Sequence, residues 1–230
     1  MSIVIAISSL LVAYLLGAIP TGFWVAKLAK GIDIRKEGSG STGATNVLRC
    51  VGKKEAAFVM FFDIFKGYLA VAIAIYLESA YSCDLFGVRG LLPVFAAVIS
   101  LVGHSKSIFL NFQGGKSVAT GLGTYFALNW LVAIIAFTLW VFLIFVTRYV
   151  SLASIIGTFS CIVTMISFGS PLPYIVYTLI AFTYITARHT ENIKRLMKGT
   201  EPKFGQKAKD DKENTPKEVA NDQANSESQI

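Results

Sequence analysis

The segment EGSGSTGATN, residues 37–46, lies between two long apolar runs and is followed closely by Arg49. Its glycines, Gly38, Gly40 and Gly43, permit positive φ angles, so that successive backbone N–H groups can converge on one point. Further donors come from the guanidinium of Arg49 and from the hydroxyls of Ser39, Ser41, Thr42 and Thr45. The alternative is a flexible surface loop in which glycine and serine are filler. The density of donors favours an anion site, with phosphate as the natural ligand.

The composition is too apolar for a soluble domain. Apolar residues make up 54% of the 230 residues, and the mean hydropathy is +0.60. We expect an all-α integral membrane protein in which residues 1–204 form one domain with about seven transmembrane helices, since a helical span needs ~20 residues. The apolar runs fall at 3–26, 56–77, 86–103, 117–129, 130–147, 149–168 and 172–187. Residues 205–230 are polar and are predicted to be a disordered cytoplasmic tail.

The end of the first apolar run and the division of residues 117–147 follow from physical arguments. The first run continues to about Ala26 without a cleavage site, so it is predicted to be one retained helix. The run over 117–147 is divided at Asn129-Trp130, because a single helix there would be ~46 Å long, against a ~30 Å hydrocarbon core.

Basic residues predict the orientation. Nineteen of the 21 Lys and Arg residues lie in the first loop, in the other loops on that side and beyond residue 187, whereas the opposite loops hold only Arg89. Because cytoplasmic loops carry an excess of basic residues, the amino terminus is predicted to lie outside and the carboxyl terminus in the cytoplasm. The same argument makes nucleic acid an improbable partner for the net charge of +7.

Lys66 is the remaining basic residue and follows Asp63 by three positions inside the second apolar run. At this spacing the two side chains share a helix face and can neutralise each other at membrane depth. A structural ion pair and a role in the site are both open.

A second polar loop follows the third apolar run and includes His104. It ends in Gly114, Gly115, Lys116 and Ser117, directly before an apolar run. Unpaired N–H groups at a helix start attract anions, and Lys116 lies beside them. A helix start that simply needs a turn would also explain the two glycines.

A third polar segment, residues 187–201, follows the last apolar run. His189 and Asn192 share a helix face, whereas Glu191 points elsewhere and is expected to pair with Arg195. An even number of spans separates the three loops, so all three are predicted to meet on the cytoplasmic face. Neither the histidines nor the three cysteines have metal-ligand spacing, and no metal or cofactor is expected.

These residues fit more than one class of membrane protein. A transporter or flippase for a phosphorylated compound would also use broken helices and cationic sites, although the sequence has no internal repeat. A non-catalytic protein that senses lipid phosphate through basic loops is a third possibility.

Three motifs together closely resemble those of the bacterial glycerol-3-phosphate acyltransferases that use acyl phosphate, the PlsY family. They are Gly38–Asn46 with Arg49, Gly103-His104 with Gly114–Thr120, and Arg188–Arg195 with Gly199-Thr-Glu201. The resemblance covers nearly the whole chain up to the tail. It departs from the family at Ser41, where Asn is usual, at Gln113, where a basic residue is common, and in the variable stretch Lys106-Ser107.

The resemblance implies a multi-pass enzyme of the bacterial inner membrane with its active site facing the cytoplasm. It would transfer a fatty acyl group from acyl phosphate to the sn-1 hydroxyl of glycerol 3-phosphate, giving lysophosphatidate and phosphate in the first step of phospholipid synthesis. An enzyme that produces acyl phosphate is an expected partner.

The resemblance also implies residue roles. The expected catalytic residues are Ser39, Arg49, His189 and Asn192. Substrate binding is expected at Gly38, Gly40, Ser41, Gly43, Thr45, Asn46, His104, Gly114, Gly115, Lys116 and Ser117, and structural support from Glu191. Asp63 and Lys66 are counted with the structural residues on the helix spacing given above, and the resemblance does not decide between their two roles. Since cationic donors are abundant and no Ser-His-Asp grouping is recognisable, we expect direct attack by the glycerol hydroxyl without a covalent acyl-enzyme.

Overall fold

The computed structural model describes residues 2–206, and their regular structure is helical. The predicted tail beyond residue 206 lies outside the described residues. The elements in chain order are α1 Ser2–Ala18, α2 Thr21–Lys30, the 3₁₀ helix η1 Ile34–Lys36, α3 Ala44–Cys50, α4 Lys53–Tyr81, α5 Leu91–Ser105, the 3₁₀ helix η2 Ile108–Leu110, α6 Val118–Leu128, α7 Trp130–Thr147, α8 Val150–Ser167, α9 Leu172–Arg188 and α10 Thr190–Met197.

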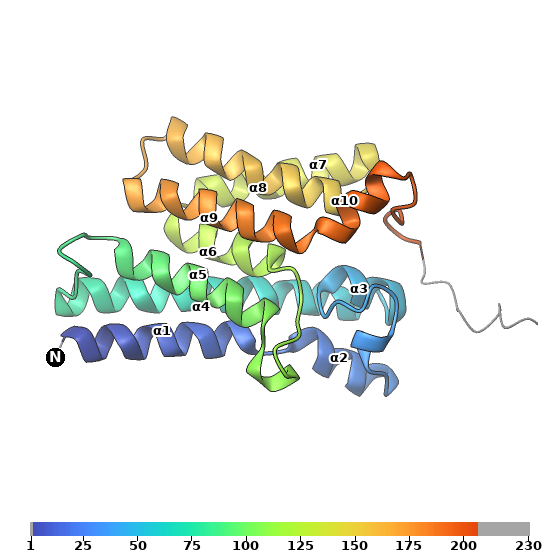
Figure 1. Cartoon of the computed structure of the whole chain (residues 1–230), viewed down its shortest axis with the longest axis horizontal. Helices are drawn as coiled ribbons and strands as arrows, with labels where there is room; N and C mark the ends of the chain where they lie inside the picture. The colour runs from blue at the N-terminus through green and yellow to red at the C-terminus, as the bar shows by residue number, and fades with distance from the viewer. Residues whose placement is uncertain (1, 207–230) are drawn as a thin grey trace, which may run out of the picture.

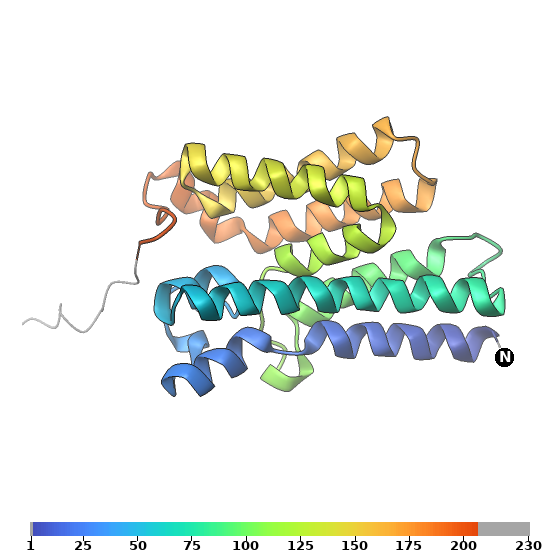
Figure 2. The ribbon, with the colours of Figure 1, turned by 180° about the vertical axis from the view of Figure 1, so that it is seen from behind.

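The long helices form two groups with α6 between them. Helices α1, α4 and α5 pack on one another, α8 packs against both α7 and α9, and α6 packs against both α4 and α7 (Figures 1 and 2). Glycines allow the close approach of α4 and α6: a Cβ on Gly67 would collide with the carbonyl oxygen of Thr120, and one on Gly123 with that of Ile64. This seam fixes the start of α6, where the second polar loop ends.

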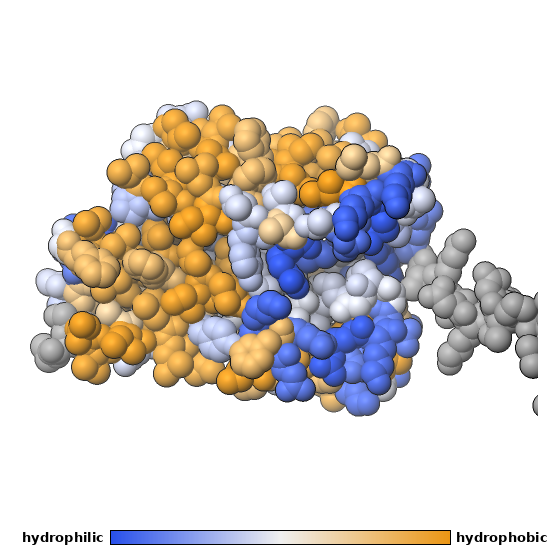
Figure 3. All heavy atoms as spheres, viewed as in Figure 1, coloured by the Kyte–Doolittle hydropathy of each residue, from blue (hydrophilic) through white to orange (hydrophobic). Residues whose placement is uncertain are grey.

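The described residues contain four apolar helices of sufficient length to cross a membrane, with α1 and α2 counted together. Helices α5 and α6 are apolar but shorter, so the count of seven spans stays a prediction. Figure 3 shows hydrophobic residues over most of the visible face and hydrophilic ones gathered at the end that carries α2, α3 and α10.

Two helix boundaries test the sequence predictions. The break at Asn129 is confirmed: α6 ends at Leu128, and Asn129 Oδ1 caps α7 by accepting hydrogen bonds from the N–H groups of Leu131 and Val132 (3.2 and 3.4 Å). The single first helix is wrong, because the chain breaks at Ile19-Pro20 between α1 and α2. Proline has no N–H to donate and disfavours helical geometry at the residue before it.

The break between α1 and α2 explains one buried charge. Lys66 Nζ donates to the carbonyl oxygen of Ile19 (2.9 Å), one of those freed at the end of α1, and lies 2.7 Å from Asp63 Oδ1. The ion pair predicted between Asp63 and Lys66 is therefore present and buried on α4. Because Lys66 binds the chain break, it supports the fold directly, whereas Asp63 also borders the cavity described next.

Candidate active site

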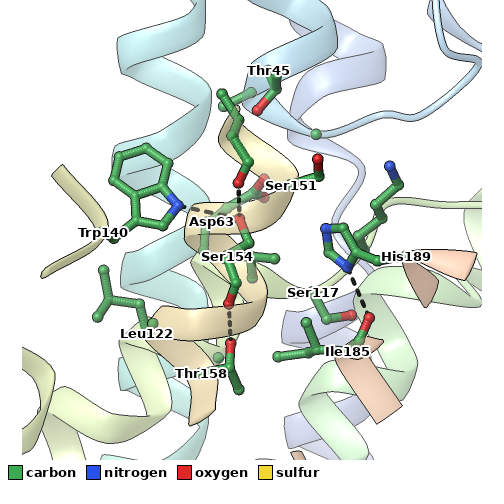
Figure 4. A pocket seen from close by; sticks show the side chains of 18 of the residues that line it. Thr45, Asp63, Ser117, Leu122, Trp140, Ser151, Ser154, Thr158, Ile185 and His189 are labelled. Atoms are coloured by element: carbon green, nitrogen blue, oxygen red, sulfur yellow. Dashed lines mark hydrogen bonds between the residues drawn. The ribbon is translucent and has the colours of Figure 1, made fainter. Parts of the chain in front are cut away.

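One cavity of about 160 Å³ receives side chains from all three polar loops. Ser39, Thr45 and Arg49 border it from the first loop and α3, Lys116 from the second loop, and His189 and Asn192 from the third. The predicted meeting of these loops is thus observed. Away from the loops, the cavity continues between α4, α6, α7 and α8, where its lining is mostly apolar (Figure 4).

The glycine-rich segment is held together by Asn46, which lies in the first turn of α3, after the N-cap residue Gly43. Asn46 Nδ2 donates to the carbonyl oxygens of Ile34, Glu37 and Ser41 (3.2, 3.0 and 2.9 Å), and its Oδ1 accepts from the N–H of Ser39 (3.0 Å). Asn46 is almost fully buried. Its amide is used within the loop, although the residue also borders the cavity, so Asn46 has a structural role and its binding of substrate stays a prediction.

Three of the backbone donors in this segment are used locally. The N–H of Ser39 donates to Asn46, that of Gly40 to the carbonyl oxygen of Glu37 (3.0 Å), and that of Gly43 to Ser41 Oγ (3.3 Å). Gly38 and Gly40 have positive φ angles, as predicted, and the loop folds around Asn46, so the anion nest stays a prediction. Arg49 and the hydroxyls of Ser39 and Thr45 remain as donors that face the cavity.

The glycines of the second loop are required by contact with His104. A Cβ on Gly114 would collide with the His104 carbonyl oxygen and one on Gly115 with its imidazole, and the Gly115 N–H donates to the same carbonyl oxygen (3.2 Å). Neither glycine is among the residues that line the cavity. The anion site at their N–H groups stays a prediction, whereas His104 and Lys116 do border the cavity.

Ser117 has a different role from the one predicted. It precedes α6 in a left-handed conformation (φ 63°), and its Oγ donates to the carbonyl oxygen of Leu101 on α5 (2.7 Å). Its hydroxyl proton is thus directed to the backbone, although the residue borders the cavity. Ser117 anchors the start of α6 and thereby holds its neighbour Lys116.

Lys116 is held by a chain of hydrogen bonds that ends at Glu201. Lys116 Nζ donates to Asn192 Oδ1, and Asn192 Nδ2 donates to Glu201 Oε1 (2.7 Å). Burial lowers the pKa of Lys116 to about 8; Glu201 opposes this shift, and Arg195, Arg49 and Arg188 add to it. Lys116 is therefore a cation at neutral pH that has exchanged most of its water for protein partners.

Glu201 has hydrogen-bond partners on two helices, α8 and α10. It accepts hydrogen bonds from Asn192, from Ser151 Oγ on α8 (2.8 Å) and from Arg195 Nε (2.8 Å). Burial raises the pKa of its carboxyl, but these three hydrogen bonds outweigh burial and hold the pKa below its usual value. Glu201 is consequently an anion that fixes α8, α10 and the chain beyond α10 around the cavity.

His189 lies at the junction of α9 and α10 with 3% of its surface exposed. Its Nδ1 is 2.8 Å from the carbonyl oxygen of Ile185, an interaction that requires the proton on Nδ1 and leaves Nε2 as an acceptor (Figure 4). Burial lowers the pKa of His189 to about 4; the bond to Ile185 opposes the shift, and Lys116 adds to it. The imidazole is therefore neutral at neutral pH.

The comparisons with known proteins agree with this geometry. The family described as glycerol-3-phosphate acyltransferase matches residues 7–199. Relatives of that name from Nostoc sp. and Trichormus variabilis are 46% and 48% identical over 207 and 204 residues, covering 86% and 85% of this chain and 91% and 90% of theirs. This chain belongs to the glycerol-3-phosphate acyltransferase family.

Solved structures agree with that assignment. The crystal structure of PlsY, an integral membrane glycerol 3-phosphate acyltransferase, in its glycerol 3-phosphate form is 40% identical with a TM-score of 0.79, covering 87% of this chain and 96% of that one. The structure of its lysophosphatidic acid form has a TM-score of 0.77 and the same sequence identity, and the match covers 87% of this chain and 95% of that one. The protein described here is thus a membrane acyltransferase of the PlsY type.

Not every residue predicted for the site of this acyltransferase borders the cavity. Of the predicted residues, all in the described part of the chain, those outside its lining are Gly38, Gly40, Gly114, Gly115, Lys66 and Glu191. The predicted pairing of Glu191 with Arg195 is wrong: Glu191 pairs with Lys194 (2.8 Å) and its side chain is 71% exposed. Arg195 instead turns to Glu201, because that carboxylate is buried beside it.

The sequence reasoning missed two features of the acyltransferase site. Glu201 was quoted within a motif but given no role, although an acidic residue beyond a run of basic ones was a usable signal. Ser151, Ser154 and Thr158 also border the cavity. Their spacing of three and four in an apolar run places them on one helix face, a pattern that marks an interior surface in membrane helices.

Proposed function

We propose that this protein transfers a fatty acyl group from acyl phosphate to the sn-1 hydroxyl of glycerol 3-phosphate, giving lysophosphatidate and inorganic phosphate. One observation carries the proposal: a single cavity has Arg49, Lys116 and His189 at its polar end and an apolar lining at its other end. Two phosphate-bearing substrates need cations, and a fatty chain needs apolar walls. The relatives named glycerol-3-phosphate acyltransferase support the same reaction.

The proposed reaction is a direct acyl transfer. The hydroxyl oxygen attacks the acyl carbonyl carbon, a new ester C–O bond forms, and the bond from that carbon to the phosphate oxygen breaks with its electron pair passing to the phosphate. Phosphate is a good leaving group, so the protein mainly positions the hydroxyl and holds two anions together against repulsion. Arg49 offers a planar fork for one phosphate, and Lys116 a compact charge for the other.

The proton of the attacking hydroxyl passes to His189 Nε2 or to a phosphate oxygen of a substrate. The hydrogen bond from Nδ1 to Ile185 and the low pKa of His189 leave Nε2 available as an acceptor at neutral pH. Replacing His189 by Ala distinguishes the two routes, since loss of a general base typically costs ~10²–10⁴-fold in rate. A small loss would assign the proton to the phosphate.

Ser39 and Thr45 are proposed to donate hydrogen bonds to substrate oxygens from the first loop. Asn192 is proposed to act through Lys116, whose ammonium donates to it. A variant at Asn192 should therefore weaken substrate binding and change the pH dependence that Lys116 confers.

The active site is proposed to face the cytoplasm from a bacterial inner membrane. Seven spans with the amino terminus outside would put the three loops and the carboxyl terminus on the inner side. The supporting observation is the distribution of Lys and Arg, nineteen of which lie in segments assigned to that side and one, Arg89, opposite. This orientation is tested by replacing Lys36 or Arg89 with cysteine and labelling intact cells with a thiol reagent that does not cross the membrane. The cysteine at position 89 should react and the one at position 36 should not.

Purified protein in detergent, incubated with acyl phosphate and labelled glycerol 3-phosphate, tests the function. An acyltransferase forms labelled lysophosphatidate without any membrane gradient, whereas a transporter or a lipid sensor forms none. The Arg49→Ala variant is the matched negative control. An acyl-enzyme trapped after mixing with acyl phosphate alone would overturn direct transfer.

A further inference from the structure

The apolar end of the cavity has a definite depth. Three helices line it, with Leu122 on α6, Phe137 and Trp140 on α7, and Gly157, Thr158 and Cys161 on α8. We call this part the apolar arm. It leads away from Thr45 and the polar loops, and Figure 4 shows Ser151, Ser154 and Thr158 in succession along it.

The hydroxyls along the arm already have partners. Ser154 Oγ donates to the carbonyl oxygen of Val150 (2.8 Å) and accepts from Trp140 Nε1 (3.1 Å), and Thr158 Oγ1 donates to the carbonyl oxygen of Ser154 (2.7 Å). These groups therefore need no hydrogen bond from a ligand. The wall suits an alkyl chain despite its serine and threonine content.

On each of these three helices the arm ends at a residue of the buried core. Its last lining residues are Tyr125 on α6, Ala136 on α7 and Cys161 on α8, and all three belong to the main buried core. One turn farther, Ala133 and Met165 are fully buried in that core and do not line the cavity. From Ser151 to Cys161 the arm follows α8 for ten residues, or ~15 Å.

We propose that Cys161 and Tyr125 form the floor of this arm and set the longest acyl chain that the enzyme accepts. The inference rests on the proposed function and adds to it the residues that select the fatty substrate. A chain that reaches this floor meets close-packed core atoms rather than space, and interiors at this density yield little to an extra methylene.

Cys161 is the better floor residue to change. The Tyr125 ring packs against that of Tyr177, with 5.3 Å between ring centroids, so its removal would disturb the core. Cys161 has a small side chain, and its Sγ, a weak donor, bonds to the carbonyl oxygen of Gly157 (3.5 Å). Cys161→Ala deepens the arm and Cys161→Leu shortens it.

Cys83 provides a matched control. It is also a buried free cysteine, and its Sγ donates to a backbone carbonyl oxygen, that of Leu77 (3.1 Å). It belongs to the core between α1, α4 and α5 and does not line the cavity. Cys83→Ala and Cys83→Leu therefore repeat the chemical change away from the arm.

The experiment gives each purified variant an equimolar mixture of acyl phosphates of increasing chain length with glycerol 3-phosphate. The lysophosphatidate products are quantified by mass spectrometry. Because all chains compete for one enzyme, product ratios report relative kcat/KM and do not depend on how much of the variant is folded. Cys161→Leu should disfavour the longest chain used by the wild type by about tenfold or more relative to short chains, the discrimination typical of one methylene in an apolar pocket. Cys161→Ala should shift the ratios toward longer chains.

Product ratios equal to those of the wild type in both active Cys161 variants would overturn the proposal, as would equal shifts in the Cys83 variants. If Cys161→Leu is too unstable to assay, Cys161→Ala alone decides by the direction of its shift. Failure of the proposed function gives a different result, since the wild type itself would then form no lysophosphatidate from any chain length.

Discussion

Asn192 Nδ2 lies 2.7 Å from Glu201 Oε1, and through this hydrogen bond the carboxylate holds the amide that receives Lys116. The cation that faces the cavity is thus positioned by an anion that is itself 6% exposed. Since Glu201 also binds Ser151 and Arg195, its removal would free three donors at once.

Replacing Glu201 by Ala is expected to lower the free energy of unfolding by about 1–3 kcal/mol, because buried donors lose their acceptor. Glu191→Ala is the matched control: Glu191 is exposed and pairs with Lys194 at the surface, so the change should leave the free energy of unfolding close to that of the wild type. Thermal unfolding in detergent measures both. Equal losses for the two variants would contradict the role given to Glu201.

Arg49→Ala is expected to lower kcat/KM by about 100-fold or more while the protein still inserts and folds, because a phosphate loses its planar donor. Arg35→Ala is the control, since Arg35 pairs with Asp33 (2.7 Å) and does not line the cavity. Steady-state kinetics with both substrates measure the effect. Near-normal turnover in Arg49→Ala would remove this residue from the mechanism.

Activity should decline as the pH rises above about 8. The pKa of Lys116 is lowered to about 8, so the free enzyme carries this charge below that pH and loses it above, and phosphate binding weakens accordingly. The profile of kcat/KM for glycerol 3-phosphate measures the decline. Lys116→Arg should move the alkaline limb to higher pH, because arginine stays protonated; an unmoved limb would assign it to another group.

Gly38→Ala should destabilise the protein more than Gly31→Ala. Both glycines have positive φ (57° and 70°), so each variant bears the strain of a left-handed alanine, about 1–2 kcal/mol. At Gly31 the new Cβ meets open space, whereas at Gly38 it collides with Asn46 Oδ1 and Cys50 Sγ. Thermal unfolding and activity measure the difference. Equal effects would show that the Asn46 contact is unimportant.

Much of the site was predictable because it depends on local chemistry. Three segments rich in Gly, Ser, Lys and His stand out against apolar runs, and the parity of those runs brings the segments to one side. Arg49, Lys116 and His189 were found in this way and border one cavity. The hydrogen-bond partners of the neighbouring residues could not be predicted. Asn46, Ser117 and Glu201 form hydrogen bonds with residues 5 to 50 positions away in the chain.

The sequence by itself determined that the chain is helical and suited to a bilayer, because apolar runs and a helix break such as the one at Asn129 depend on neighbouring residues in the chain. Only the tertiary structure decided that the glycine-rich loop closes on Asn46 and that, in the third polar segment, Glu201 is buried and Glu191 is exposed. It also decided the depth of the apolar arm, which depends on how α6, α7 and α8 pack. These features depend on which acceptors from distant parts of the chain lie near each donor. Folding excludes water from the site, so each buried donor must bond to such an acceptor.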